Sequence, residues 1–347
     1  MRFPALRRAI VVGIAAWLAG PGISGDARAD GPLVSGHSMA AGRVAAEPDS
    51  AALLRPFQRE AASDRPTPDD MAQILEKGSS SNEARTDALA GLPLDKLSPE
   101  DRRAANEILM SLGLFRRLPT ISIECDPAAY DYFIRQPDAA VNIWRVLEIS
   151  EFRMTQVAPG SYRADAGDGT KGTVRLLHRG ENEHLVLCAG EYKSPLLLRP
   201  IEARALLHLE TKLVRDWEGK GRAVHRLNMF VFFPSQTVET AAKMLSPVSN
   251  MVLDRNFREV SLFVHMMTLA MVRQPSWVEQ LANRLEDVPA ESRRELIDVT
   301  AQVYVAEVKR VEAQQRRAVD ATPSRAIRPA AGERPPRTAT QRPPQPR

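Results

Sequence analysis

The histidine and cysteine side chains are the first candidates for chemistry in this chain of 347 residues, which has six His and two Cys. None of them stands in a catalytic or metal-binding motif. The sequence has no Cys-x-x-Cys or His-Glu-x-x-His spacing, no Gly-x-Ser-x-Gly turn, and no glycine-rich phosphate or dinucleotide loop. We therefore assign no catalytic residue, no metal ligand and no cofactor, and we favour a protein that is not an enzyme.

Four of the histidines lie on expected strands. His178 and His184 flank one turn with acidic residues between them, which suits either a metal ion or, in our interpretation, a solvated polar turn. His208 and His225 lie on the two arms of the last expected hairpin and could meet across it. We interpret this second pair as structural.

The two cysteines, Cys125 and Cys188, each fall on an expected strand. In an oxidising compartment they could form a disulfide bond. We prefer to read them as small buried apolar side chains, because a chain of this length can build a core without a covalent link.

The first 29 residues predict a signal peptide. Arg2, Arg7 and Arg8 precede the apolar run Ala9–Leu18, and Ala27-Arg28-Ala29 provides a cleavage site. Ten apolar residues are too few to span a bilayer, which disfavours a membrane anchor. We expect export to the periplasm, or to the extracellular side of the cell envelope, with no transmembrane segment after cleavage.

The basic charge of the chain is confined to its ends. The formal net charge is +4, of which residues 1–29 contribute +3 and residues 322–347 contribute +5, so the remainder carries −4. A mildly acidic body argues against nucleic-acid binding. We predict a disordered linker at 30–68 and a disordered Pro/Arg-rich tail at 321–347, which is either simply solvated or an electrostatic tether to an anionic envelope surface.

The segment 69–117 carries helical signals. Asp69 or Asp70 can cap a short helix that contains Met71, Ile74 and Leu75. Ser98-Pro99 is a strong helix start. The apolar positions that follow it recur at helical spacing and predict one stripe that packs on the next domain: Ala104, Ile108, Leu112 and Phe115.

Residues 118–286 predict an α+β domain. A first strand is followed by two short helices, opened by Asp126-Pro127 and Pro137-Asp138, and then by five or six antiparallel strands. The last strands are 203–215 and 222–233. Helical periodicity then begins with a short piece at 237–245 and continues along a long apolar helix at 247–273. We expect the curved sheet to grip this long helix.

A final amphipathic helix is expected at 290–320. Its apolar positions follow a heptad-like spacing: Ile297, Ala301, Tyr304, Val308 and Val311. This seam is short, so the helix either packs back on the domain or on the helix that begins at Ser98, or else mediates dimerisation.

The element order, and the segment from Pro137-Asp138 to Trp144-Arg145-Val146-Leu147, resemble the START-like (SRPBCC) helix-grip superfamily over residues 118–277. This family often has a Pro-x-x-x-Val-Trp-type helix after its first strand. The resemblance implies an apolar ligand, such as a lipid, sterol, quinone or polyketide, between the long helix and the sheet.

On this basis the candidate ligand-binding residues lie on the long helix and on the last strand: Phe257, Val264, His265, Met267, Thr268, Met271, Leu227 and Met229. We expect an exported non-enzymatic protein that binds a hydrophobic small molecule or lipid. The alternative is a structural or interaction protein of the envelope, with a filled core, that acts through its terminal helices and basic tail. A cyclase- or hydrolase-like enzyme of the same fold is a third hypothesis.

Overall fold

The computed structural model describes residues 71–193, 200–216, 219–234 and 247–321. The expected signal peptide, the linker, the helical piece at 237–245 and the basic tail beyond residue 321 lie outside these residues. The described residues up to Glu307 belong to one compact unit, and a second unit begins at Val308. Within the described part of the chain, no helix is both long and apolar enough to cross a membrane.

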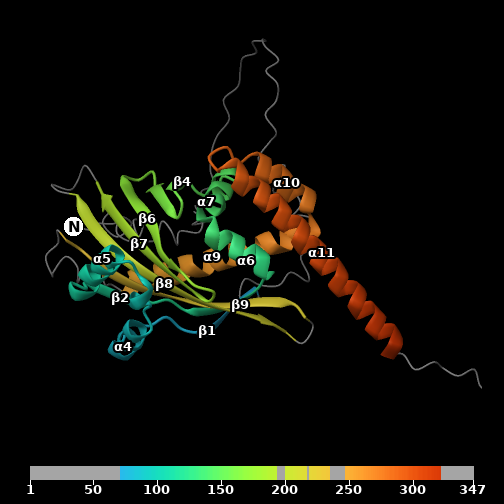
Figure 1. The fold of residues 1–347 in the computed structure, drawn as a ribbon, viewed down its shortest axis with the longest axis horizontal. Coiled ribbons are helices and arrows are strands. Elements are labelled where there is room, and N and C mark those ends of the chain that lie inside the picture. The colour runs from blue at the N-terminus through green and yellow to red at the C-terminus, as the bar shows by residue number, and fades with distance from the viewer. Residues whose placement is uncertain (1–70, 194–199, 217–218, 235–246, 322–347) are drawn as a thin grey trace, which may run out of the picture. The chain divides into compact units, whose positions relative to one another are not determined.

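The described strands form one antiparallel sheet of nine strands, in the order β1-β3-β9-β8-β7-β6-β5-β4 (Figure 1). Strand β2 pairs with the same edge of β9 as β3 does, further along that strand. The strands are β1 (Ala72–Glu76), β2 (Leu114–Arg117), β3 (Thr120–Glu124), β4 (Arg153–Ala158), β5 (Ser161–Asp165), β6 (Thr170–Arg179), β7 (Glu183–Tyr192), β8 (Ile201–Arg215) and β9 (Gly221–Phe232).

Helices cover both faces of this sheet. The helices are α4 (Asn82–Ala90), the 3-10 turn η1 (Leu94–Lys96), α5 (Pro99–Met110), α6 (Pro127–Arg135), α7 (Pro137–Val146), α9 (Pro247–Arg273), α10 (Pro275–Asn283) and α11 (Ala290–Ala321). The predicted start signals are confirmed: Ser98 Oγ accepts a hydrogen bond from the Asp101 amide, and Asp126 accepts one from Ala128.

The long helix α9 lies on one face of the sheet with α6 and α7, and we call this the grip face. Its buried side chains recur every three or four residues, as an apolar helical face requires: Leu253, Phe257, Ser261, Val264, Met267, Ala270 and Met271. The β9 side chains Leu227, Met229 and Val231 belong to the same core. The predicted fold class, a curved antiparallel sheet that grips a long helix, is confirmed.

The opposite face of the sheet, which we call the outer face, is covered by α4 and α5. Ala105 and Ile108 of α5 are fully buried in a second cluster that contains Leu206 and Phe230 of the sheet. The predicted packing of this helix on the following domain is thus confirmed. The sheet is therefore the middle layer of three, which is why the apolar end of β9 faces a core on both sides.

The helix predicted around Met71, Ile74 and Leu75 is wrong. Residues 72–76 form the edge strand β1, in which Ala72 pairs with Ile123 and Ile74 with Ile121. Ile74 and Leu75 are 46% and 49% exposed, so neither side chain is buried in the core. Backbone pairing along β3 stabilises five residues better than a single isolated helical turn does.

The apolar stripe predicted from Ala104 to Phe115 is also wrong beyond Met110, where α5 ends. Phe115 lies in β2 and pairs with Phe230, with their ring centroids 5.3 Å apart. The link between the two elements passes close to β9, since a Cβ at Gly113 would lie 3.1 Å from the Phe233 ring. Phe115 lies in an apolar core in both the prediction and the structure, but it belongs to strand β2 and not to the predicted helix.

The beginning of α11 packs back on the domain, although of the predicted seam only Ile297 packs against the core. Its buried apolar side chains are Leu296, Val299 and Val303, whereas Tyr304 is 43% exposed. Two polar contacts hold this part of the helix against α6. The Tyr132 hydroxyl donates to the Ser292 carbonyl over 3.0 Å, and Arg135 pairs with Glu295 at 2.6 Å.

Candidate functional site

An apolar compartment lies between the sheet, α9 and the pair α6–α7. It contains a small cavity of about 70 Å³. Five aromatic side chains line this cavity: Tyr130, Phe133, Trp144, Phe257 and Phe263. Phe263 of α9 meets Phe133 and Trp144 edge-on, with ring centroids 5.2 and 5.4 Å apart, which ties α9 to both short helices.

Four buried polar side chains form a continuous chain of hydrogen bonds beside this cavity, which we call the polar chain. The Tyr130 hydroxyl lies 2.9 Å from Thr211 Oγ1 and 3.1 Å from His225 Nδ1. His225 Nε2 lies 2.8 Å from Ser261 Oγ. All four side chains are buried, and three of them, Tyr130, His225 and Ser261, line the cavity.

Strand register and helix periodicity bring the polar chain together. The β8–β9 register pairs Thr211 with His225, and Ser261 follows Phe257 by one turn on the buried face of α9. The same register places His208 opposite Asn228, three residues along β9 from His225. Because successive side chains of a strand alternate between faces, His208 and His225 lie on opposite faces and do not meet.

Burial lowers the pKa of His225 to about 4, so this imidazole is neutral at pH 7 and carries one N–H. Ser261 Oγ donates to the Phe257 carbonyl over 2.8 Å. The hydroxyl therefore accepts from His225 Nε2, and Nδ1 accepts from Tyr130. In this arrangement His225 does not withdraw a proton from Ser261, so the chain suits binding or structure rather than nucleophilic attack.

Of the candidate ligand-binding residues, Phe257 and Val264 line the cavity. Four others are buried in the surrounding core without lining it: Leu227, Met229, Met267 and Met271. The other two candidates, His265 and Thr268, interact with backbone carbonyls. His265 Nδ1 lies 2.7 Å from the Glu124 carbonyl, and Thr268 Oγ1 donates to the Val264 carbonyl over 3.1 Å.

Sequence reasoning missed Tyr130, Ser261 and the aromatic side chains that α6 and α7 contribute. One signal was available, because Ser261 interrupts the buried apolar positions of α9 at helical spacing from Phe257 and Val264. A hydroxyl on the buried face of a helix needs a partner, and His225 on the apolar face of β9 needs one as well.

The remaining histidines do not form a metal site among the described residues. His208 and His178 both approach the Glu183 carboxylate, at 3.3 and 3.7 Å, and Lys96 pairs with the same carboxylate at 2.6 Å. His184 is buried, which lowers its pKa to about 4. The two cysteines are separate buried thiols, and burial raises both pKa values to about 12.

Comparisons with known proteins do not identify a family. No family model matches the chain, and no curated protein matches it. A solved structure of a conserved protein from Geobacillus kaustophilus matches with 14% sequence identity and a TM-score of 0.30. The match covers 42% of this chain and 93% of that protein.

Proposed function

We propose that this chain is an exported, non-enzymatic protein of the START-like type that binds a hydrophobic small molecule or lipid in the compartment between the sheet and α9. The observation that carries the proposal is the polar chain on the wall of an aromatic-lined cavity. Burying four polar side chains is unfavourable unless each is hydrogen-bonded, and aliphatic side chains would fill the same volume more simply.

The wall chemistry suits a molecule that is mostly apolar and has one polar group. The rings of Trp144 and Phe263 offer apolar contact, while Ser261 retains an acceptor lone pair next to His225. Ligand sites in proteins commonly combine a predominantly apolar lining with a few placed polar groups.

The cavity must widen to hold a lipid. At about 70 Å³ it is roughly half the size of an engineered cavity that binds benzene. Its rim residues Ile134, Val260 and Phe263 are only half-buried, so the compartment lies near the surface between α6–α7 and α9. We infer that a ligand enters by separating these helices, without disturbing the strands.

The small volume favours a second candidate. If the core is effectively filled, the chain is a structural or interaction protein of the envelope, with its working surfaces on the terminal helices and the basic tail. The six Arg of residues 322–347 then bind an anionic surface, and this attachment weakens steeply between about 50 and 300 mM salt because exposed charges are screened within about 10 Å.

Native mass spectrometry of the purified protein, before and after organic extraction, separates the two candidates. A co-purifying hydrophobe that extraction removes supports the binding protein. A stable protein that carries no hydrophobe, and takes up none from a panel of alcohols and fatty acids, supports the filled-core alternative.

A matched pair of variants locates the bound molecule. Ala140→Leu adds volume to the cavity wall, whereas Ala164→Leu adds the same volume at an equally buried core position on β5 that does not line the cavity. Both substitutions overpack the core. Only Ala140→Leu should reduce hydrophobe uptake, and equal loss in both variants would place the molecule elsewhere.

A further inference from the structure

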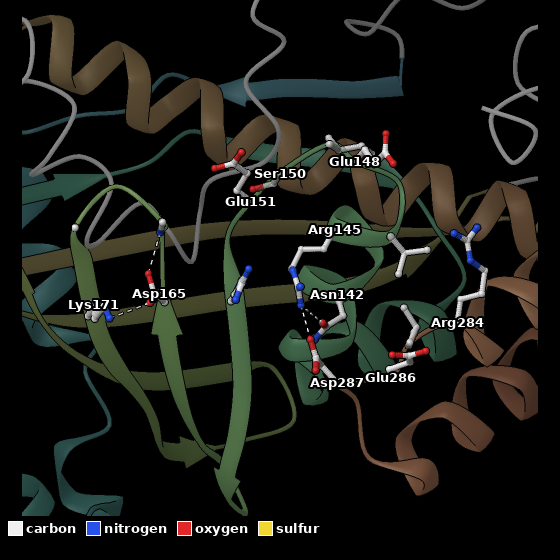
Figure 2. A pocket seen from close by; sticks show the side chains of 16 residues that line it. Asn142, Arg145, Glu148, Ser150, Glu151, Asp165, Lys171, Arg284, Glu286 and Asp287 are labelled. Atoms are coloured by element: carbon white, nitrogen blue, oxygen red, sulfur yellow. Dashed lines mark hydrogen bonds and ion pairs between the residues drawn. The ribbon is translucent and has the colours of Figure 1, made fainter. Parts of the chain in front are cut away.

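Helix α7 contributes to two hollows of opposite character. Ala140, Val141 and Trp144 line the apolar cavity of about 70 Å³ beside the polar chain. Asn142 and Arg145, on the adjoining side of the helix, line an open polar cleft of about 1120 Å³ that also includes the α7–β4 and α10–α11 loops (Figure 2). Residues that are neighbours along α7 thus have very different surroundings.

Charged side chains gather in the cleft and not in the cavity. In the cleft, Arg145 pairs with Asp287, and Lys171 pairs with Asp165 at 3.3 Å. Of the residues that the structure describes, none with a charged side chain lines the cavity, and the pKa of His225 in its wall is about 4, so this imidazole adds no charge at pH 7. A charged group of a ligand would lose its water there without gaining an ion pair, which is strongly unfavourable.

The protons of the polar chain are already committed. The Tyr130 hydroxyl donates to His225 Nδ1, so Thr211 Oγ1 is the donor in its 2.9 Å contact with Tyr130. His225 Nε2 donates to Ser261, which in turn donates to the Phe257 carbonyl. The polar chain can therefore accept a hydrogen bond from a ligand, but it has no proton left to donate.

The indole of Trp144 is a donor that is not committed. Trp144 is 2% exposed and lines the cavity, yet its Nε1 atom is buried with no hydrogen-bond partner among the described residues. The neighbouring Phe263 ring, whose centroid is 5.4 Å away, offers no oxygen or nitrogen, and the face of an aromatic ring is only a weak acceptor. Because a buried indole N–H normally has a partner, this donor indicates an acceptor that a ligand brings.

We propose that the cavity selects uncharged molecules whose polar group is a hydroxyl or carbonyl oxygen, held by the Trp144 Nε1–H; this inference rests on the hydrophobic-ligand function proposed above. A hydroxyl can in addition donate to the lone pair that Ser261 retains. A carboxylate or an ammonium group on the same apolar chain is rejected, because the wall offers no opposite charge. The ligand class is therefore neutral amphiphiles such as long-chain alcohols, and not fatty acids or amines.

Three probes of equal chain length test the selectivity against charge: 1-octanol, octanoate and octylammonium. Isothermal titration calorimetry of the full chain at pH 7, with each probe below its micelle-forming concentration, measures their affinities. Octanol should bind at least about tenfold more tightly than either ion. Octanoate or octylammonium binding as tightly as octanol would overturn the selectivity while leaving a hydrophobic site in place. Binding of none of the three would refute the hydrophobic-ligand function itself, and the selectivity with it.

Substitution of the indole tests the role of Trp144. Trp144→Phe keeps an aromatic ring and removes the N–H, so octanol should bind about fivefold more weakly, whereas 1-octene, which has no oxygen, should change by less than about twofold. Trp277→Phe makes the same change at a buried tryptophan of α10 that does not line the cavity, and should leave the octanol affinity unchanged. Equal losses of octanol and 1-octene in Trp144→Phe would show that the indole only packs against the ligand.

The indole N–H resonance provides a readout in the wild-type protein, which does not depend on the stability of a variant. The chain has four tryptophans, and sequential assignment of the nitrogen-correlated NMR spectrum identifies the Trp144 signal. Octanol should move this signal downfield, because the N–H then donates to oxygen, and 1-octene should not. A Trp144 signal that saturating octanol leaves unchanged would overturn the assignment of the donor.

Discussion

Polar groups are stabilised in opposite ways on the two faces of the sheet. On the grip face, Thr211 and His225 are buried, neutral and hydrogen-bonded in the polar chain. On the outer face, the adjacent residues Glu210 and Arg226 are charged and about one-third exposed, and they pair through bonds of 2.5 and 3.1 Å. The neutral, buried pair Thr211–His225 and the solvent-exposed ion pair Glu210–Arg226 are therefore only one residue apart along β8 and β9.

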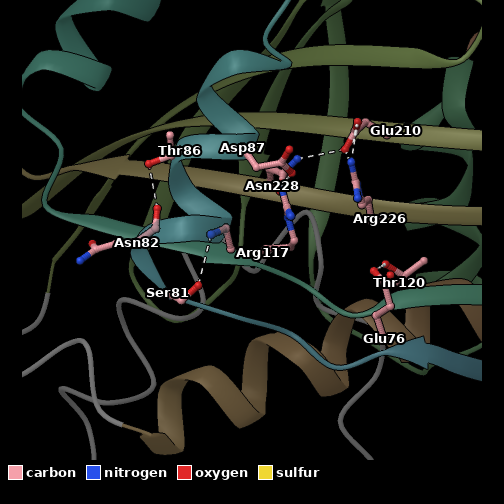
Figure 3. Close-up of polar contacts among 11 residues, drawn as sticks. Glu76, Ser81, Asn82, Thr86, Asp87, Arg117, Thr120, Glu210, Arg226 and Asn228 are labelled. Atoms are coloured by element: carbon pink, nitrogen blue, oxygen red, sulfur yellow. Dashed lines mark hydrogen bonds and ion pairs between the residues drawn. The ribbon is translucent and has the colours of Figure 1, made fainter.

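The outer-face contacts form a wider network than that single pair. Asn228 donates to Glu210 over 3.1 Å and accepts from Arg117, which in turn pairs with Asp87 of α4 (Figure 3). Solvated ion pairs contribute little to stability, whereas a buried polar group is costly once it loses its partner. Asn228 is buried as well, so the contrast is between the Thr211–His225 pair and the Glu210–Arg226 pair, and not between the whole faces.

The largest difference is expected between His225→Ala and Arg226→Ala, at neighbouring positions of β9. His225→Ala removes one hydrogen-bond partner each from Tyr130 and Ser261 and opens a void, so the free energy of unfolding should fall by about 3 kcal/mol. Arg226→Ala removes a screened surface pair and should lower it by about 0.5 to 1 kcal/mol. Urea unfolding of both variants measures the contrast, and equal losses would remove the distinction between the two faces.

Acid should destabilise the grip face. The folded-state pKa of His225 is about 4, below the unfolded value of 6.5, so the unfolded chain binds the proton first. The contribution of neutral His225 to the free energy of unfolding is complete above pH 6.5. It decreases by about 2 to 3 kcal/mol as the pH falls toward 4. His184 acts in the same direction, since its pKa is also about 4.

The control for this acid effect is His225→Gln, measured in urea at several pH values. Asp138 acts in the opposite direction, because burial raises its pKa, but it is shared by both proteins and cancels in their difference. The stability gap between wild type and His225→Gln should narrow between pH 6.5 and 4. A gap independent of pH would show that His225 is not held neutral.

A smaller effect is expected for Tyr130→Phe, which removes the hydroxyl and keeps the ring. The variant loses the contacts to Thr211 and His225, and the free energy of unfolding should fall by about 1 to 2 kcal/mol. Tyr162→Phe is a suitable comparison, since its hydroxyl donates to the Arg135 carbonyl over 3.2 Å outside the polar chain. A loss for Tyr130→Phe no larger than that for Tyr162→Phe would argue against a cooperative chain.

The smallest effect should come from Glu210→Gln on the outer face. Its carboxylate is about one-third exposed, so loss of the charge should lower the free energy of unfolding by about 0.5 kcal/mol at low salt and by less at high salt. Chemical denaturation at two salt concentrations checks this expectation. A large, salt-independent loss would mean that the outer face is as sensitive as the grip face.

Much of the fold follows from local patterns in the sequence. The Ser98-Pro99 and Asp126-Pro127 starts and the long helix at 247–273 were all predictable, because capping and periodicity act within a few residues. The failures at Ile74 and Phe115 share a cause: both residues belong to short strands that pair with residues far away in the sequence. Pairing of that kind leaves little local signal.

The candidate site was less predictable than the fold. The alternation of β9 places His225 on the apolar face, but its partners come from α6, β8 and α9, and their meeting depends on register and helix packing. His265 was among the candidate ligand-binding residues, but its Nδ1 lies 2.7 Å from the Glu124 carbonyl. A side chain on the gripped helix can face either a cavity or a strand end, and periodicity does not distinguish these directions.

Crystallography under xenon pressure tests the central claim most directly. The account predicts a xenon atom on the grip face, in the cavity bounded by Trp144, Val264 and Phe263 beside His225. It predicts none in the outer-face cluster around Ile108 and Phe230. An unoccupied grip face, or xenon bound in the outer-face cluster instead, would contradict a ligand compartment under α9.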